Sequence, residues 1–193
     1  MTTATLPKDY SFYFTGFSRR GVRTATQILV EAALVEGCYI QLFDDNYVNK
    51  NDNEEVIWAK ISSSPFKDRS RPGKFNGAVF LEPSLLGNPQ IINPLSSADW
   101  LLLNTKISRR ELAKTFKSPL VTYPFDASEI ARYFMEDNFP GLVLLGGLLK
   151  IIPVVELSTI ETVIRGIFKD RWETELLEKN IIALRMGFNE FSL

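Results

Sequence analysis

The stretch YSFYFTGFSRRGVRTATQILVEAALVEG, residues 10–37, gives the strongest indication of the fold. It opens with an aromatic run at residues 10–14, which favours a β-strand because aromatic side chains are enriched in strands. A loop bounded by Gly16 and Gly21 follows. Apolar residues then recur at the three-and-four spacing of one buried helix face; they are Val22, Ala25, Ile28, Leu29, Ala32 and Ala33. The stretch therefore predicts a strand, a glycine-bounded loop and a helix.

That loop is the first candidate binding site. A loop between a strand and a helix can offer backbone N–H groups to a phosphate or a carboxylate. The candidate residues are Gly16, Ser18, Arg19, Arg20 and Gly21. Arginine adds positive charge at the helix N-terminus and can bind phosphate through two hydrogen bonds. The alternative is a basic turn that faces solvent or another subunit.

The composition excludes several kinds of chemistry. The chain has no histidine and one cysteine, Cys38. It therefore holds neither a Ser-His nor a Cys-His catalytic pair, and no histidine metal site. One thiol cannot hold an iron–sulfur cluster or form an internal disulfide. Cys38 is expected to be a buried strand residue, so any redox cofactor must come from another chain.

Charge and hydropathy indicate an ordinary globular domain. Of 193 residues, 45% are hydrophobic, and 22 basic against 23 acidic side chains give a net charge of −1. That balance argues against nucleic-acid binding, which usually needs a basic surface. The longest apolar run, residues 141–152, is broken by Lys150 and is shorter than the roughly 20 residues of a membrane span. The start of the chain lacks a signal-peptide pattern, so we expect a cytoplasmic protein without a membrane contact.

Five further strands are predicted from short apolar runs between polar segments, at residues 38–43, 56–61, 78–81, 100–103 and 120–123. Runs such as WLLL at residues 100–103 suit strands covered on both faces. With the helices between them, the order predicts one α/β domain over residues 1–193. It would be a Rossmann-like layered domain with a mostly parallel sheet flanked by helices. The glycine-bounded loop should then lie at the carboxyl edge of the sheet.

Three helix starts are predicted from capping boxes, in which a Ser or Asp stands three residues before a Glu. The pairs are Ser108 with Glu111, Asp126 with Glu129, and Ser158 with Glu161. The capping role explains the Asp126 pair without acid–base catalysis. A final helix should carry one apolar stripe, made of Leu177, Ile181, Leu184, Phe188 and Phe191.

An apolar helix is predicted from Pro140 to about residue 152. Gly146 and Gly147 inside it predict tight packing against the sheet or another subunit, since each costs about 1 kcal/mol relative to alanine. This helix and the Phe188/Phe191 terminus offer more apolar surface than one small sheet needs. We therefore expect a hetero-oligomer.

Two polar segments could contact partners. Residues 66–74 hold five charged side chains, four of them basic, in a loop that is either solvated or a docking surface. Tyr47 lies in a second polar loop and could face a subunit interface, where tyrosine is enriched.

Four segments together resemble the gamma subunit, or gamma domain, of the pyruvate:ferredoxin (2-oxoacid:acceptor) oxidoreductase family. The family's G-x-G-G-Q-G-V opening stands here as GFSRRGV, residues 16–22, followed by Thr24 and Ala25. Its D-A-T-E-I-A block stands as DASEIA at residues 126–131, and its L-G-A-L segment as part of GLVLLGGL at residues 141–148. Its C-terminal helix is matched by Lys169, Asn180, Ala183 and Gly187.

The resemblance implies a subunit without catalytic residues of its own. Its complex would decarboxylate a 2-oxoacid oxidatively to an acyl-CoA and pass electrons to ferredoxin or NAD. Thiamine diphosphate, Mg²⁺ and iron–sulfur clusters would belong to the alpha, beta and ferredoxin-like delta subunits. The gamma chain would shape the complex, and the residues from Gly16 to Gly21 could contact coenzyme A.

The departures from the family pattern keep two alternatives open. Ser18, Arg19 and Arg20 replace Gly, Gly and Gln, and side chains there block close approach of the backbone to a ligand. Of the family's Y-G-x-E-x-R-G-G segment only Tyr47 remains recognisable. One alternative is a purely structural or regulatory gamma paralogue. The other is a free-standing α/β protein that binds a nucleotide or coenzyme A.

Overall fold

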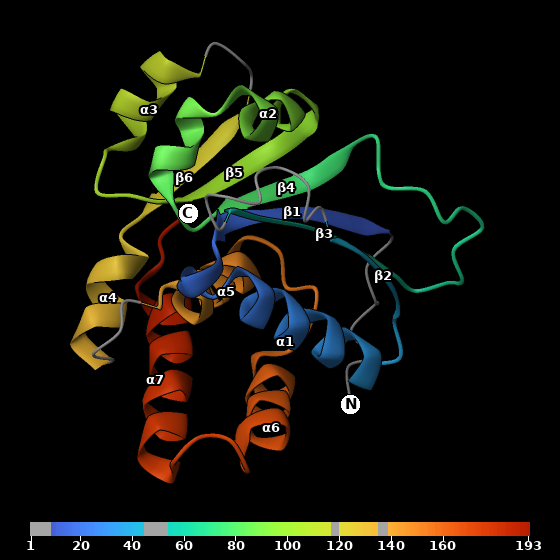
Figure 1. Ribbon diagram of the computed structural model, residues 1–193, viewed down its shortest axis with the longest axis vertical. Helices are drawn as coiled ribbons and strands as arrows, with labels where there is room; N and C mark the ends of the chain where they lie inside the picture. The colour runs from blue at the N-terminus through green and yellow to red at the C-terminus, as the bar shows by residue number, and fades with distance from the viewer. Residues whose placement is uncertain (1–8, 45–53, 117–119, 135–138) are drawn as a thin grey trace.

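One six-stranded sheet organises the molecule, whose computed structural model describes residues 9–44, 54–116, 120–134 and 139–193 (Figure 1). The strand order is β2-β3-β1-β4-β5-β6. Strands β1, β4, β5 and β6 run parallel to one another, while β3 is antiparallel to both β1 and β2. The mostly parallel α/β sheet is thus confirmed. The strands are β1 Tyr10–Phe17, β2 Tyr39–Asp44, β3 Glu54–Ser62, β4 Phe75–Phe80, β5 Ala98–Asn104 and β6 Val121–Phe125.

Helices cover both faces of this sheet, as Figure 1 shows. One face packs against α1 Val22–Val35, α4 Ala127–Phe134, α5 Gly141–Ile151, α6 Leu157–Phe168 and α7 Thr174–Glu190. The other carries a thinner layer of α2 Pro89–Ile92, α3 Arg109–Thr115 and three-residue-per-turn helices η2 Pro83–Gly87 and η3 Asn93–Ser97. This second layer buries Leu85, Ile91 and Leu95, which lie in a segment without a helical or strand period in its apolar residues.

Strand β1 is the centre of both layers. Phe12 and Phe14 point into the core beneath α1 and α5, and Tyr13 points into the core on the opposite face. The alternation follows from the two-residue period of a strand. Aromatic side chains therefore fill both sides of the sheet at its middle, as the run at residues 10–14 predicts. The strand continues three residues further, to Phe17, and takes in Gly16.

The most apolar helix, α5, is buried by its own chain rather than by a partner. Residues 141–149 are all buried, and α5 crosses α7 at two glycines. A Cβ atom on Gly146 would stand 2.3 Å from the Leu184 carbonyl oxygen, and one on Gly187 would stand 2.0 Å from that of Val143. The expected packing of Gly146 against the sheet or another subunit is therefore wrong, because α7 of the same chain takes that place. Gly147 lies against Phe125 of β6, so the expected packing against the sheet is found at this glycine.

The C-terminal apolar surface is covered as well. Phe191 is 3% exposed and packs edge-on against Tyr123 and Phe125 of β6. Neither α5 nor this terminus therefore provides the exposed apolar surface on which the expected hetero-oligomer was based. No helix in the described part of the chain is long and apolar enough to cross a membrane.

The three predicted capping boxes have different outcomes. Ser108 and Glu111 form the full box at the start of α3. Asp126 accepts from the Glu129 N–H at 3.0 Å, which gives half of the second box. The third prediction is wrong: α6 begins at Leu157 after Glu156, and its first turn has no side-chain cap. Glu161 instead turns to α7, where its two oxygens accept from Arg185, each at 2.6 Å.

The Glu161–Arg185 pair makes folding stability depend on pH. Hydrogen bonds from Arg185 hold the pKa of Glu161 below its ordinary value of 4.5. A lowered pKa stabilises the folded chain above the ordinary value, and the contribution is lost as pH falls through the folded value. Glu161→Gln should lower the free energy of unfolding at pH 7 by about 0.5–1 kcal/mol, with no difference in strong acid. Urea unfolding across that pH range measures this effect, and Arg185→Gln should cost little in the Glu161→Gln background.

Candidate functional site

The predicted site lies where the chain leaves two neighbouring parallel strands in opposite directions. After β1 the chain passes through the short helix η1, Ser18–Arg20, into α1 on one face. After β4 it enters η2 on the other face. In open α/β sheets, ligands bind in the crevice that such a reversal leaves at the carboxyl ends of the strands. The loop from Gly16 to Gly21 therefore lies at the carboxyl edge of the sheet, as expected. It also lies beside the crevice in which open α/β sheets bind ligands.

Both glycines of this loop are required by packing. Gly21 has φ +88°, and a Cβ atom there would stand 2.7 Å from the Phe139 ring. The start of α5 approaches so closely that a Cβ on Gly141 would lie 2.7 Å from the Gly21 carbonyl oxygen. A Cβ on Gly16 would meet the Leu81 Cβ at 2.9 Å. The space that a phosphate cradle would need beside Gly21 is thus occupied by Phe139 and α5.

The arginines of the loop mostly face carboxylates. Arg20 pairs with Glu82 at 3.3 Å, an ion pair that spans the crevice from the end of β1 to the end of β4. Arg23, in the first turn of α1, pairs with Asp44 at 2.6 Å and with Glu55 at 3.5 Å. Arg19 is exposed and has no ion-pair partner among the described residues. Among the described residues, no carboxylate competes with an incoming anion for the charge of Arg19.

Glu55 is a largely buried carboxylate beside the loop. It stands opposite Gly16 in the β1–β3 pair, and its side chain is 14% exposed. Burial raises the pKa of Glu55, and the charge of Arg23 opposes that rise. Sequence reasoning missed Glu55, Glu82 and Asp44, because only the strand register and the β4 turn bring them to the loop. The sequence around residues 54–55 contains no motif that predicts a role at this loop.

A buried amide joins the other strand ends at this edge. Asn104, at the end of β5, donates to the Leu81 carbonyl oxygen and to Ser128 Oγ, both at 2.8 Å. Its own oxygen accepts from the Ser128 N–H at 3.1 Å, at the start of α4. Lys106 lies 3.3 Å from Asp126 and 3.7 Å from Glu129. The residues of the DASEIA segment thus serve capping and ion pairing, which is the role the sequence favoured over catalysis.

The described residues offer little for redox or metal chemistry on this chain. They bring no three His, Cys, Asp or Glu side chains close enough to hold a metal ion. Cys38 is buried and directly precedes β2, so its expected burial is confirmed, though it lies outside the strand. Burial raises the pKa of the Cys38 thiol, helped by the nearby charge of Glu36. A protonated buried thiol is a poor nucleophile.

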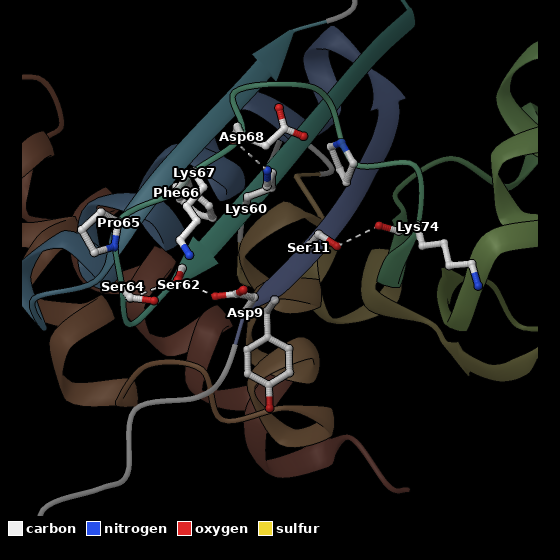
Figure 2. Close-up of a pocket in the computed structure, with 12 residues that line it drawn as sticks. Asp9, Ser11, Lys60, Ser62, Ser64, Pro65, Phe66, Lys67, Asp68 and Lys74 are labelled. Carbon is white, nitrogen blue, oxygen red and sulfur yellow. Dashed lines mark hydrogen bonds between the residues drawn. The ribbon is translucent and has the colours of Figure 1, made fainter.

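A polar cavity of about 400 Å³ lies beside the start of β1, at the end of the sheet opposite to the carboxyl ends of its parallel strands. Figure 2 shows Asp9, Ser62, Lys60 and Lys67 around it. The Asp9 carboxylate accepts from Ser62 Oγ at 2.5 Å, and Lys60 Nζ donates to the Asp68 carbonyl oxygen at 3.4 Å. Two of the three cavity lysines, Lys67 and Lys74, are exposed, and carboxylates share the lining. This lining has no concentrated charge of one sign that would select a ligand.

Comparison with known proteins gives one consistent result. The family model described as pyruvate ferredoxin/flavodoxin oxidoreductase matches residues 11–190. The common gamma subunit of the pyruvate/ketoisovalerate oxidoreductases of Pyrococcus abyssi is 30% identical over 178 residues, covering 92% of this chain and 94% of that protein. The pyruvate synthase subunit PorC of Thermotoga maritima is 28% identical over 187 residues, covering 95% of each chain.

Solved structures agree with this result. The crystal structure of the pyruvate oxidoreductase subunit PORC from Thermotoga maritima matches with a TM-score of 0.78 and 26% identity, over 94% of this chain and 96% of that one. The 2-oxoglutarate:ferredoxin oxidoreductase of Magnetococcus marinus, solved with 2-oxoglutarate, coenzyme A and succinyl-CoA bound, matches with a TM-score of 0.75. At 16% identity, over 94% of this chain and 30% of that longer one, this second match shows the fold alone.

Proposed function

The chain belongs to the pyruvate ferredoxin/flavodoxin oxidoreductase family, and from this membership we infer that it works as one gamma-type domain spanning residues 1–193. It is the gamma subunit of a 2-oxoacid:ferredoxin oxidoreductase complex. The observation that carries this conclusion is the end-to-end match to separate gamma and PorC subunits, which covers more than nine-tenths of both chains. A chain of the same length and fold as those subunits is expected to occupy the same place in its complex.

The reaction proceeds on other subunits. We assign thiamine diphosphate, Mg²⁺ and the iron–sulfur clusters to the alpha, beta and delta subunits, as the resemblance to the family implies. One buried cysteine cannot ligate a cluster, and no metal-binding group of three side chains forms among the described residues. The complex would decarboxylate a 2-oxoacid oxidatively to an acyl-CoA, with ferredoxin or NAD accepting the electrons. This chain would contribute shape and subunit contacts.

Size measurement in a native extract tests the subunit role. The chain should elute in a complex several times larger than its own 21.9 kDa, together with three other polypeptides. Mass spectrometry of the co-eluting chains identifies them. An extract in which the chain elutes as a soluble monomer would contradict the assignment, because a subunit of a complex should elute with its partners.

The loop from Gly16 to Gly21 is assigned to packing and assembly in preference to coenzyme A binding. Arg20 is committed to Glu82, and Phe139 occupies the space beside Gly21. The exposed Arg19 is the feature that favours the second candidate function, a contact with a coenzyme A phosphate. A phosphate at this loop would have to compete with Glu82 for Arg20.

The Arg19→Ala/Arg20→Ala variant, assembled in the complex, separates the two roles. We expect the KM for coenzyme A to stay within about twofold of wild type. A lost charge-assisted hydrogen bond costs about 1.5–3 kcal/mol, which is roughly tenfold or more in KM. A tenfold rise in the KM for coenzyme A, with the KM for the 2-oxoacid unchanged, would therefore show that the loop binds coenzyme A. Because loss of the Arg20–Glu82 pair alone could shift both constants, Glu82→Gln is the matched control.

A further inference from the structure

The two edges of the sheet differ in how they are protected. At one edge, β6 contains Pro124, which cannot donate a backbone hydrogen bond and so blocks strand addition. At the other, β2 reads YIQLFD, with no proline or basic residue and one carboxylate at its end. Natural proteins usually protect exposed edges with proline, lysine or bulges. The unprotected β2 edge is therefore the place where the sheet can accept another strand.

An apolar groove of about 620 Å³ runs along this edge. Its lower wall is the end of α1, where the Leu34 side chain is 47% exposed. Leu42 of β2, also 47% exposed, lies on the same face because Ile40, two residues earlier, packs towards α1. Exposed apolar side chains from two elements thus form one continuous strip beside the free edge of β2, which pairs on that side with no strand in the described part of the chain.

The upper wall is a basic loop, residues 63–74, which extends past β2 (Figure 1). It is held in place by the Asp68 carbonyl oxygen, which accepts from Gln41 at 3.1 Å and from Lys60 at 3.4 Å. Phe66 packs beneath the Lys60 ammonium at 4.8 Å. The loop is therefore anchored to β2 and β3, and the position of its Arg69 beside the groove is defined.

The charge of this wall selects the partner. The only carboxylate of residues 63–74 belongs to Asp68 and accepts from the Ser70 N–H at 2.8 Å. Arg69 and Lys67 are exposed, and neither has a carboxylate partner among the described residues. An incoming strand would place alternate side chains on the apolar wall and on Arg69. The fitting sequence therefore alternates apolar and acidic residues.

We propose that the β2 edge, between Leu42 and Arg69, docks an extended segment with alternating apolar and acidic residues from another subunit of the oxidoreductase complex. The segment pairs with β2 through backbone hydrogen bonds, as in other cases of strand addition. A second copy of this chain fits less well, because two-fold pairing would bring two basic loops to one interface. The proposal rests on the gamma-subunit role, since it requires that partner subunits exist.

Paired variants in the assembled complex test this surface. Leu42→Asp and Arg69→Glu should each weaken binding of the full chain to the purified remaining subunits at least tenfold. The controls Leu176→Asp, at a side chain 41% exposed on α7, and Arg110→Glu, at an exposed arginine on α3, should change binding less than twofold. Thermal unfolding of each isolated variant verifies that it folds. Hydrogen exchange at the β2 amides should slow at least tenfold on assembly in the wild-type chain.

The outcomes distinguish failure of the docking proposal from failure of the gamma-subunit role. If the wild-type chain joins no complex, the gamma-subunit role fails and the docking proposal fails with it. If the wild-type chain assembles while Leu42→Asp and Arg69→Glu bind like their controls, and β2 exchange is unchanged, only the docking surface is overturned. If the purified chain dimerises and Leu42→Asp abolishes the dimer, the occupant is a second copy, and the proposed partner is wrong.

Discussion

Replacement of Gly187 by alanine should destabilise the chain by roughly 3 kcal/mol, the upper part of the range for overpacked cores. The added methyl carbon would stand 2.0 Å from the Val143 carbonyl oxygen and 2.7 Å from its carbon. Both are backbone atoms of α5 and cannot rotate away, so α5 and α7 would have to separate. In a domain of this size the midpoint of thermal unfolding should fall by roughly 6–12 °C.

Gly166 in α6 provides the matched control. A Cβ atom there meets nothing within 4 Å, and the residue is exposed within its helix. Gly166→Ala should therefore raise stability by about 0.5–1 kcal/mol, because alanine loses less backbone entropy than glycine in a helix. Denaturant unfolding of both variants measures the difference. Equal stability of Gly187→Ala and wild type would show that α5 and α7 do not meet at these glycines.

The strand–loop–helix start of the fold was predictable because its residues carry their own signal. Aromatic residues at 10–14 mark β1, and the three-and-four spacing of Val22 to Ala33 marks α1. Both elements meet the core with the faces that their periods define. The sequence of α5 does not predict which element each of its faces contacts, because a helix that is apolar on all sides is buried on all sides. Here α7 of the same chain, through Gly187, covers it.

The capping boxes show where local patterns fail. Ser108 and Glu111 form the full capping box, and no ion-pair partner of Glu111 appears among the described residues. Glu161 has the same spacing from Ser158, yet Arg185 lies 24 residues further along the chain and pairs with it in two places. A charge-assisted pair with two bonds outweighs one capping hydrogen bond. Contacts between residues far apart in the sequence therefore decide which local signals are realised.

The candidate site was predicted in position but not in its electrostatics. Its place at the carboxyl edge follows from the order of strand and helix. The partners of its arginines come from β2, β3 and the β4 turn, as Asp44, Glu55 and Glu82. No sequence motif around Arg20 or Arg23 predicts that these carboxylates are their ion-pair partners. The loop therefore has much less free positive charge than its sequence indicates.

The largest functional effect should be the complete dependence of activity on other subunits. The chain has no histidine, and its one thiol is buried and protonated. The carboxylates nearest the candidate site, Glu55 and Glu82, are both ion-paired with arginine. Among the described residues, these groups leave no free acid–base pair and no cluster ligands at the crevice. We therefore predict that the isolated chain supports neither thiamine chemistry nor electron transfer.

A turnover assay of the isolated chain tests this claim most directly. The purified chain is mixed with pyruvate, coenzyme A, thiamine diphosphate, Mg²⁺ and an artificial electron acceptor, and bound iron is measured in the same sample. The same assay with the purified complex serves as the positive control, extended to other 2-oxoacids if pyruvate is not turned over. We predict turnover by the complex only, with no iron on the isolated chain. Clear 2-oxoacid oxidation by the isolated chain would contradict its role as a non-catalytic gamma subunit.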